Sequence, residues 1–222
     1  MDTREYLRIL VEEIHSAIVA TIDKDGHPVT RAIDMMLWDD NGVYFLTAKG
    51  KEFYRQLQEQ QYISLSAVRD KKAISLRGCV ENIGSEKLDV IFEKNEYMQK
   101  IYPGDTRNAL EVFRLYDAQG EFFDISDPSH VTRGAINIGI KPELISGFFV
   151  GEGCIGCRNC SVVCPQSCID SSSIPAVIDQ NRCLHCGRCA EACPVGVIER
   201  RRWYDAGRKK DVSDKAAPVG EY

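Results

Sequence analysis

The sequence predicts an α+β protein in two parts: a closed antiparallel β-barrel with flanking helices, followed by a small cysteine-rich domain. Two observations lead to this prediction. Short apolar runs joined by hairpin-type turns follow each other through residues 17–125, which favours an antiparallel sheet that closes on itself. Nine of the ten cysteines then lie between Cys154 and Cys193. The chemistry of the C-terminal part therefore differs from that of the body.

Length and composition exclude several classes of protein. The chain has 222 residues, 44% of them hydrophobic, and a formal net charge of −5 at pH 7. It can bury a sizeable core, and its acidic balance argues against general nucleic-acid binding. No apolar run reaches the ~18 residues that a membrane span needs. Its first residues are acidic where a signal peptide is basic. We therefore expect a cytoplasmic protein with neither a nucleic-acid partner nor a membrane span.

The barrel elements are expected in a simple order along the body. An amphipathic helix begins after Asp2 or Thr3, with apolar residues at helical spacing up to Ile14. Turns that contain Gly after Asp or Asn separate the first three strands, as tight hairpins prefer. A short helix is expected at 51–60, between the third and the fourth strand. The five expected strands cover residues 17–22, 29–37, 43–47, 62–68 and 73–83.

The second half of the body is expected to hold a helix and a last hairpin. Ser85 is a candidate N-cap for a helix whose apolar stripe includes Leu88 and Met98, and Pro103 with Gly104 ends it. The segments 113–117 and 121–125 flank the sequence AQG and read as a hairpin. The sequence contains neither a GxGxxG fingerprint nor a Walker loop, which argues against dinucleotide-binding and P-loop folds.

The cysteine-rich part contains the same spacing twice. Each copy reads C-x2-C-x2-C-x3-C-P, first over residues 154–165 and again over residues 183–194. Three closely spaced thiolates can bind three corners of a cubane cluster, while the fourth cysteine binds the other cluster. Cluster one is therefore expected at Cys154, Cys157, Cys160 and Cys193. Cluster two is expected at Cys164, Cys183, Cys186 and Cys189.

The alternative for this part is zinc, which commonly takes two separated C-x2-C pairs. The third cysteine and the proline, present in both copies, favour two clusters. Residues 151–200 resemble a bacterial-type ferredoxin with two [4Fe-4S] clusters. Cys168 fits neither copy. Its alternatives are a spare thiol near cluster two, an alternative ligand and a buried small residue; we favour the last, as for Cys79 in its strand. His185 stands between two ligands and is not expected to bind the metal, because the cysteines already complete both sets.

A second candidate site lies where the third strand meets the following helix. Thr47 ends the strand, and Lys49 and Lys51 stand at the start of the helix, whose N-terminus already carries partial positive charge. A bound anion, most naturally a phosphate, explains two lysines there. Arg31, on a neighbouring strand, offers a forked contact to the same group. The alternative is that both lysines are solvated and that Arg31 is an outward strand charge.

The body resembles the FMN-binding split barrel of the pyridoxamine 5'-phosphate oxidase-like superfamily. The resemblance covers residues 1–126 and rests on the opening helix and the segments ATIDKDGHPVTRAIDMM, LTAKGKEFYRQL and SLRGCVE. It implies that Arg31, Thr47, Lys51 and, less directly, Lys49 hold the FMN phosphate. The backbone of Ala32, Ile33 and Asp34 would run beside the flavin ring.

The resemblance also implies a homodimer with flavin at the interface. Arg77 would then belong to the face near the partner's flavin. One feature departs from the family: the C-terminal substrate-binding strand, rich in Trp, Arg and His, has no convincing match, and RRWYDAG (201–207) is only superficially similar. Oxidation of pyridoxamine phosphate is therefore not carried over to this chain.

The sequence thus predicts an iron–sulfur flavoprotein: an FMN-binding split barrel over 1–145, a two-cluster [4Fe-4S] domain over 146–200 and a tail over 201–222. It would pass electrons between an external donor or acceptor, the clusters and FMN, acting on an unknown small-molecule substrate in an anaerobic setting. The alternative is a non-enzymatic electron carrier or redox sensor whose barrel serves docking and dimerisation. A haem-handling barrel is weaker, because His15, His27 and His130 have no supporting context in the sequence.

Overall fold

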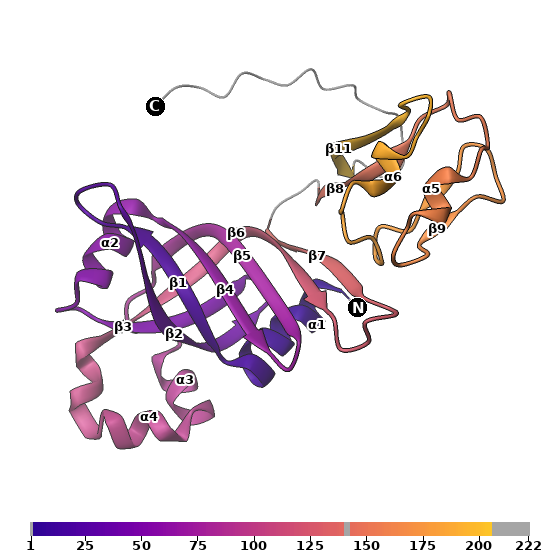
Figure 1. Ribbon diagram of the computed structural model, residues 1–222. Helices are drawn as coiled ribbons and strands as arrows, with labels where there is room; N and C mark the ends of the chain where they lie inside the picture. The colour runs from indigo at the N-terminus through magenta and orange to yellow at the C-terminus, as the bar shows by residue number, and fades with distance from the viewer. Residues whose placement is uncertain (1, 140–142, 206–222) are drawn as a thin grey trace.

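The computed structural model describes residues 2–139 and 143–205. Six antiparallel strands form a barrel in the order β3-β2-β1-β4-β5-β6, and the pairing of β3 with β6 closes it. Figure 1 shows the barrel and, beside it, the smaller C-terminal part. A seventh strand, β7 (Thr132–Ile138), extends the sheet beyond β6. The strands of the barrel are β1 (Ser16–Ile22), β2 (Pro28–Asp39), β3 (Gly42–Ala48), β4 (Tyr62–Arg69), β5 (Lys72–Asn82) and β6 (Leu110–Asp124).

Apolar side chains at every second position of the strands fill the interior of the barrel. In β1 and β4 every second residue is buried and the residues between them are exposed, as expected for a sheet with one face in the core. Each large apolar side chain buried in this way contributes about 1.5–3 kcal/mol to stability. The interior is centred on large, almost fully buried side chains: Leu10, Phe45, Ile74, Leu76, Phe113 and Phe122.

The opening helix ends in an unusual way. The side chain of Asp2 caps α1 (Thr3–Arg8) by accepting a 3.0 Å hydrogen bond from the Glu5 backbone. The helix then widens into a π-helical turn, η1 (Ile9–Ile14). His15 follows with φ 70° and ψ −58°, a region that is strained for a non-glycine residue. The expected helix is therefore present, but it ends in a π-helical turn, and His15 follows this turn directly before β1.

A second apolar cluster covers one outer side of the barrel. Short helices α3 (Leu88–Lys94) and α4 (Glu96–Ile101), followed by η2 (Gly104–Ala109), connect β5 to β6. Their buried side chains pack on residues of β2, β3 and β6. The single helix expected after Ser85 is thus two helices that meet at Asn95, whose side-chain amide donates to the Met36 carbonyl oxygen (3.1 Å). Ser85 does not cap α3, because the N-cap residue is Lys87.

The expected hairpin around AQG is wrong. Residues 110–124 form the single long strand β6, whose first half pairs with β3, whose second half pairs with β7, and which pairs with β5 over most of its length. A bulge at Asp117 of β6, opposite the step from Gly78 to Cys79 in β5, lets the two strands stay paired. Gly120 lies opposite Leu76, where an added Cβ would come within 1.8 Å of the Ser75 carbonyl oxygen. The glycine is needed for close strand packing and not for a turn.

The C-terminal part is built from short elements around the cysteines. Strands β8 (Glu143–Val150) and β11 (Ile198–Asp205) pair in antiparallel fashion. These strands cross both of the domain boundaries expected from the sequence, at 145/146 and 200/201; the remainder of the predicted tail, residues 206–222, lies outside the described residues. No helix in the described ranges is long and apolar enough to cross a membrane. Between the two strands lie α5 (Asn159–Val162), β9 (Ile169–Asp170), β10 (Val177–Ile178) and α6 (Arg188–Glu191).

Candidate functional site

Two hollows in the C-terminal part are lined by cysteines drawn from both copies of the motif. Cysteines from one loop line each hollow together with the last cysteine of the other copy. The first hollow is lined by Cys154, Cys157, Cys160 and Cys193. The second is lined by Cys164, Cys183, Cys186 and Cys189, with Cys168 beside them.

The two cysteine loops have the same backbone shape. The third and fifth residues of each motif have positive φ: Gly156 (69°) and Arg158 (64°) in the first loop, His185 (55°) and Gly187 (80°) in the second. A left-handed residue turns the chain sharply, so successive cysteines can face one hollow. Each loop then enters a short helix that carries its third cysteine into a small apolar core. The sequence repeat is therefore also a structural repeat.

The surroundings of the thiols affect how easily each forms the thiolate that a metal requires. Burial raises the pKa of Cys160, Cys183 and Cys189, so a metal bound there must displace protons. At Cys193 burial also acts to raise the pKa, but backbone N–H groups from Val195 to Ile198 outweigh it and lower the pKa. In the described residues no three Cys, His, Asp or Glu side chains converge on one ion position. The four thiolates of a cubane bind four different irons and therefore surround a larger space.

Cys168 and Cys79 differ in their surroundings. Cys168 is 5% exposed, and its Sγ lies 3.5 Å from the Sγ of Cys164, so it is buried as expected but lies directly beside a predicted ligand. Cys79 lies in β5 and is half-buried rather than buried. His185 is partly buried; burial, followed by the charges of Arg133 and Arg200, lowers its pKa to about 4. Its ring is therefore neutral at pH 7.

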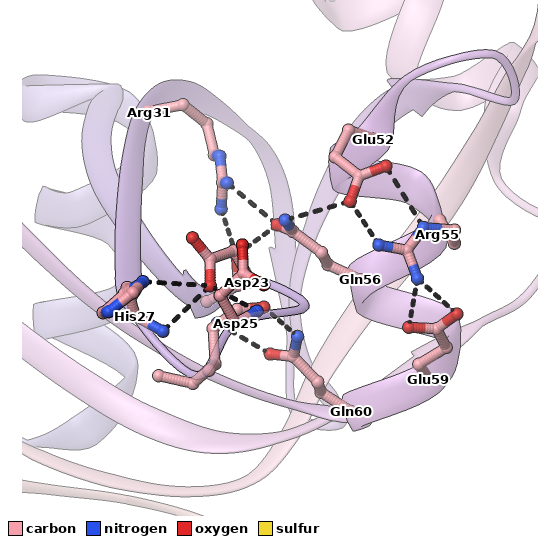
Figure 2. A network of polar contacts seen from close by, with 11 residues as sticks. Asp23, Asp25, His27, Arg31, Glu52, Arg55, Gln56, Glu59 and Gln60 are labelled. Carbon is pink, nitrogen blue, oxygen red and sulfur yellow. Dashed lines mark hydrogen bonds and ion pairs between the residues drawn. The ribbon is translucent and has the colours of Figure 1, made fainter.

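In the barrel, Arg31 lies on the inner side of β2, against α2 (Glu52–Gln60). Its Nη1 donates to Thr21 Oγ1 (2.5 Å), and its Nη2 donates to Gln56 Oε1 (2.9 Å). Its guanidinium carbon lies 4.4 Å from the centroid of the Phe53 ring. Figure 2 shows this network and its continuation, through Gln56, to the first residue of α2, Glu52.

Two features of this region fit an anion. The described structure contains no ion pair between Arg31 and a carboxylate, and burial lowers the pKa of Arg31. A partly buried cation without a counter-ion is costly unless an anion binds it. Thr47 is also nearly fully buried, and its Oγ1 has no hydrogen-bond partner among the described residues. Arg31 and Thr47 therefore fit the phosphate expected from the sequence.

The two lysines have different surroundings. Lys51 is the N-cap residue of α2, as expected, and is exposed. Lys49 Nζ lies 3.1 Å from Glu111 Oε1, so it already has a counter-ion. Both line an open hollow at the outer side of α2, which Arg31 and Thr47 do not line. The structure thus brings Arg31 to the inner side of α2 and the lysines to its start and outer side.

The other predicted flavin contacts lie on the outward face of the sheet. Ala32 and Asp34 alternate with the inward Arg31 and Ile33 along β2, opposite Ile18 and Ser16 of β1. Arg77 is exposed on β5, opposite Ser64. These positions share one broad face of β2, β1, β4 and β5, with exposed Ile18, Tyr62 and Val68.

A polar cluster around Asp34, in the middle of β2, was missed by the sequence analysis. Tyr97 of α4 donates its hydroxyl proton to Asp34 Oδ2 (2.8 Å), and its oxygen lies 3.0 Å from His15 Nε2. His15 Nδ1 lies 3.1 Å from the Val11 carbonyl oxygen, which can only accept. Ser16 Oγ donates to Asp34 Oδ1 (2.5 Å). Burial, followed by the hydrogen bond and charge of Asp34, raises the pKa of Tyr97.

This cluster is a continuous hydrogen-bonded chain from imidazole to carboxylate. His15 Nε2 also lies 3.7 Å from Asp34 Oδ2, so the three side chains are in mutual contact. All three side chains are partly exposed, so the chain can exchange protons with a bound molecule. Residues 15, 34 and 97 are far apart in the sequence, and no spacing signal links them. The other two histidines lie beside surface carboxylates, His27 near Asp23 and His130 near Asp127.

These features define a split-barrel protein that carries a ferredoxin-type domain with two cysteine-lined hollows. The chain belongs to the pyridoxamine 5'-phosphate oxidase family, whose model matches residues 3–118, more than half of the chain. Residues 153–197 match the 4Fe-4S dicluster domain. The family and the type of iron–sulfur domain expected from the sequence are therefore confirmed.

Individual relatives resemble one part or the other. Over 55 residues the chain is 44% identical to pyruvate synthase subunit PorD of Methanothermobacter marburgensis, covering 25% of this chain and 64% of that protein. Over 93 residues it is 31% identical to a pyridoxine/pyridoxamine 5'-phosphate oxidase of Bacteroides thetaiotaomicron, covering 41% of this chain and 44% of that one. The chain spans less than two thirds of the length of either relative.

A solved structure resembles the barrel. It is a NimC/NimA family protein from Clostridium acetobutylicum, with a TM-score of 0.50 and 15% identity over 60% of this chain and 93% of that one. At this identity the likeness shows the fold alone. It agrees with the closed six-stranded antiparallel barrel and its flanking helices.

Proposed function

We propose that this protein is an iron–sulfur flavoprotein that passes electrons between two [4Fe-4S] clusters and FMN, as an oxidoreductase of unknown substrate. The observation that carries the proposal is the pair of crossed, four-cysteine hollows in the same chain as a barrel of a flavin-using family. Clusters carry single electrons. A flavin accepts one or two, so it can couple the clusters to two-electron chemistry.

The cluster ligands in this proposal are the eight cysteines of the two hollows, with one cluster in each. The buried thiols and the backbone N–H groups around Cys193 support this assignment. For FMN we propose that Arg31 and Thr47 bind the phosphate and that Lys51 adds charge at the start of α2. Lys49 is a weaker contact, because Glu111 already neutralises it.

In this proposal the flavin ring lies beside Ala32–Asp34, which brings it to the His15–Tyr97–Asp34 chain. Flavin reduction consumes protons as well as electrons. We propose that His15, Tyr97 and Asp34 supply or remove the proton at this site.

We further propose a homodimer formed through the outward face of β2, β1, β4 and β5. The exposed apolar side chains of Ile18, Tyr62 and Val68 on this face support it, because large exposed apolar patches mark interaction surfaces. Arg77 would then face the flavin bound by the partner. Sedimentation analysis tests this point, and a monomer at all concentrations would contradict it.

The alternative is an electron carrier or redox sensor whose barrel binds no flavin. Measuring iron and FMN in protein purified without oxygen separates the two. We expect about eight iron atoms per chain and about one FMN. Arg31→Ala and Lys51→Glu should keep the iron and lose FMN, each by at least about tenfold in affinity, since contacts between charged groups contribute about 1.5–3 kcal/mol. One zinc with little iron contradicts the cluster proposal, and wild-type protein without FMN favours the carrier.

A further inference from the structure

The barrel touches the cysteine-rich part at a defined junction. Within the described residues four hydrogen bonds join the two parts, all from the segment around β7. Two of them involve the side chain of Gln166, which is 7% exposed. Its Oε1 accepts from the Val131 backbone (3.2 Å), and its Nε2 donates to the Pro128 carbonyl oxygen (3.1 Å).

Arg133 of β7 makes the other two contacts. Its backbone N–H donates to the Asn181 carbonyl oxygen (2.7 Å), and its Nη1 lies 3.1 Å from Nδ1 of His185. The same Nη1 donates to Glu121 Oε2 (2.7 Å), and the guanidinium stands 5.0 Å from the centroid of the Phe123 ring. The Arg133 side chain is only 19% exposed. It is therefore a fixed cation at the junction.

All of these contacts fall on one of the two hollows. Gln166, Asn181 and His185 each stand two residues from a cysteine that lines the second hollow. In the described ranges no hydrogen bond joins the barrel to the first cysteine loop, residues 154–160. The second hollow is therefore the one held against the barrel.

His185 connects Arg133 to the second cysteine loop. A guanidinium has only donors, so Nδ1 of His185 accepts from Arg133 and the ring proton is on Nε2. Nε2 is buried and has no partner among the described residues. The His185 backbone N–H already donates to the Sγ of Cys183 (3.4 Å). His185 therefore links Arg133 to the cysteine loop through its ring nitrogen and its backbone N–H.

We propose that the cluster bound by Cys164, Cys183, Cys186 and Cys189 is the one through which the barrel and the ferredoxin-type part exchange electrons. Arg133 is the positioning residue. It holds the loop of this cluster through His185, and its positive charge raises the reduction potential of the cluster. Each passage oxidises one side by one electron and reduces the other by one. The cluster in the first hollow then meets the external carrier. This inference rests on the proposed function, because it requires both clusters to be present.

The proposal predicts which cluster responds to Arg133. Net charge and hydrogen bonds to sulfur set the reduction potential of a cluster. Removing a nearby positive charge disfavours adding an electron, so the potential falls. In Arg133→Gln the potential of cluster two should therefore shift to a lower value, while cluster one is unchanged. Glu121→Gln, which leaves Arg133 without its counter-ion, should shift cluster two in the opposite direction.

The experiment is an anaerobic redox titration of the full chain, followed by electron paramagnetic resonance. Arg158→Gln is the control for the first cluster, because Arg158 is a cation that lines the first hollow. We expect Arg158→Gln to shift one signal, and Arg133→Gln and Glu121→Gln to shift the other in opposite directions. The inference is overturned if Arg133→Gln and Glu121→Gln both leave the potentials unchanged, or if they shift the same signal as Arg158→Gln. Either result leaves the proposed function intact. Wild-type protein without two cluster signals contradicts the proposed function itself.

Discussion

Cys164 and Cys168 stand four residues apart with their sulfur atoms 3.5 Å from each other, yet the motif requires only Cys164. The spacing C-x2-C-x2-C-x3-C-P ends at Cys164, and Cys193 occupies the same place in the second copy. The position four residues after Cys193 is Val197, so the second copy has no counterpart of Cys168. Cys168 packs in the small apolar core beside Ile169. We interpret it as a packing residue beside the second hollow.

This interpretation predicts different outcomes for two cysteine variants. Cys168→Ala should retain about eight iron atoms per chain, whereas Cys160→Ala should lose about half of them or convert one cluster. Iron content and visible absorbance of anaerobically purified protein measure this. Equal iron loss in the two variants would show that Cys168 is a ligand.

The His15–Tyr97–Asp34 chain makes a second prediction at this scale. Tyr97→Phe removes the hydroxyl that joins imidazole and carboxylate, so proton delivery to the flavin should slow. Flavin reduction by a one-electron donor should be slower by roughly 10²-fold, within the usual range for a general acid, while FMN affinity stays unchanged. Rapid-mixing absorbance follows the flavin, and Tyr102→Phe serves as control. A wild-type rate in Tyr97→Phe would remove the chain from the proton path.

The sequence predicts the site only in part, for a physical reason. The spacing of cysteines in the sequence predicts a cluster site, because three of its four ligands lie within a few residues of each other. The polar chain of His15 and the junction at Arg133 depend on which distant strands meet. No spacing within one sequence records which strands meet, so the contacts of His15 and Arg133 could not be predicted from it.

At the scale of elements, β1 to β5 agree with the strands expected from alternation to within three residues. The sequence prediction fails at β6 and β7, where glycine takes the place of an apolar residue in the alternating pattern. Gly120 suggested a turn within β6. In β7 the inward position Gly134 hides the alternation, because the Tyr6 ring occupies the space where a Cβ would lie. Tertiary packing, not local preference, decides both elements.

The assignment of residues 118–120 to a strand can be tested by adding one methyl group at Gly120. In Gly120→Ala the added Cβ meets the backbone oxygen of Ser75, so we expect a loss of at least about 2 kcal/mol in the free energy of unfolding. In Gly50→Ala nothing lies within 4 Å of the added Cβ, and the change should stay within about 1 kcal/mol. Urea denaturation followed by circular dichroism compares them. Equal stability of the two variants would favour a turn at AQG.

At the scale of the whole molecule, the chain joins a 4Fe-4S dicluster domain to a barrel of the pyridoxamine 5'-phosphate oxidase family. The junction through Gln166 and Arg133 fixes the second hollow against the barrel. The first hollow has no described hydrogen bond to the barrel and is rimmed by exposed Ile155 and Val195. This arrangement favours entry of electrons at one end and their use at the other.

An anaerobic reductive titration of the purified chain tests this account most directly. Two clusters that take one electron each and one FMN that takes two require about four electrons per chain. The flavin bands and the broad iron–sulfur absorbance should both bleach in the same titration. Uptake of about two electrons, with no flavin bands at any stage, would contradict the flavoprotein account.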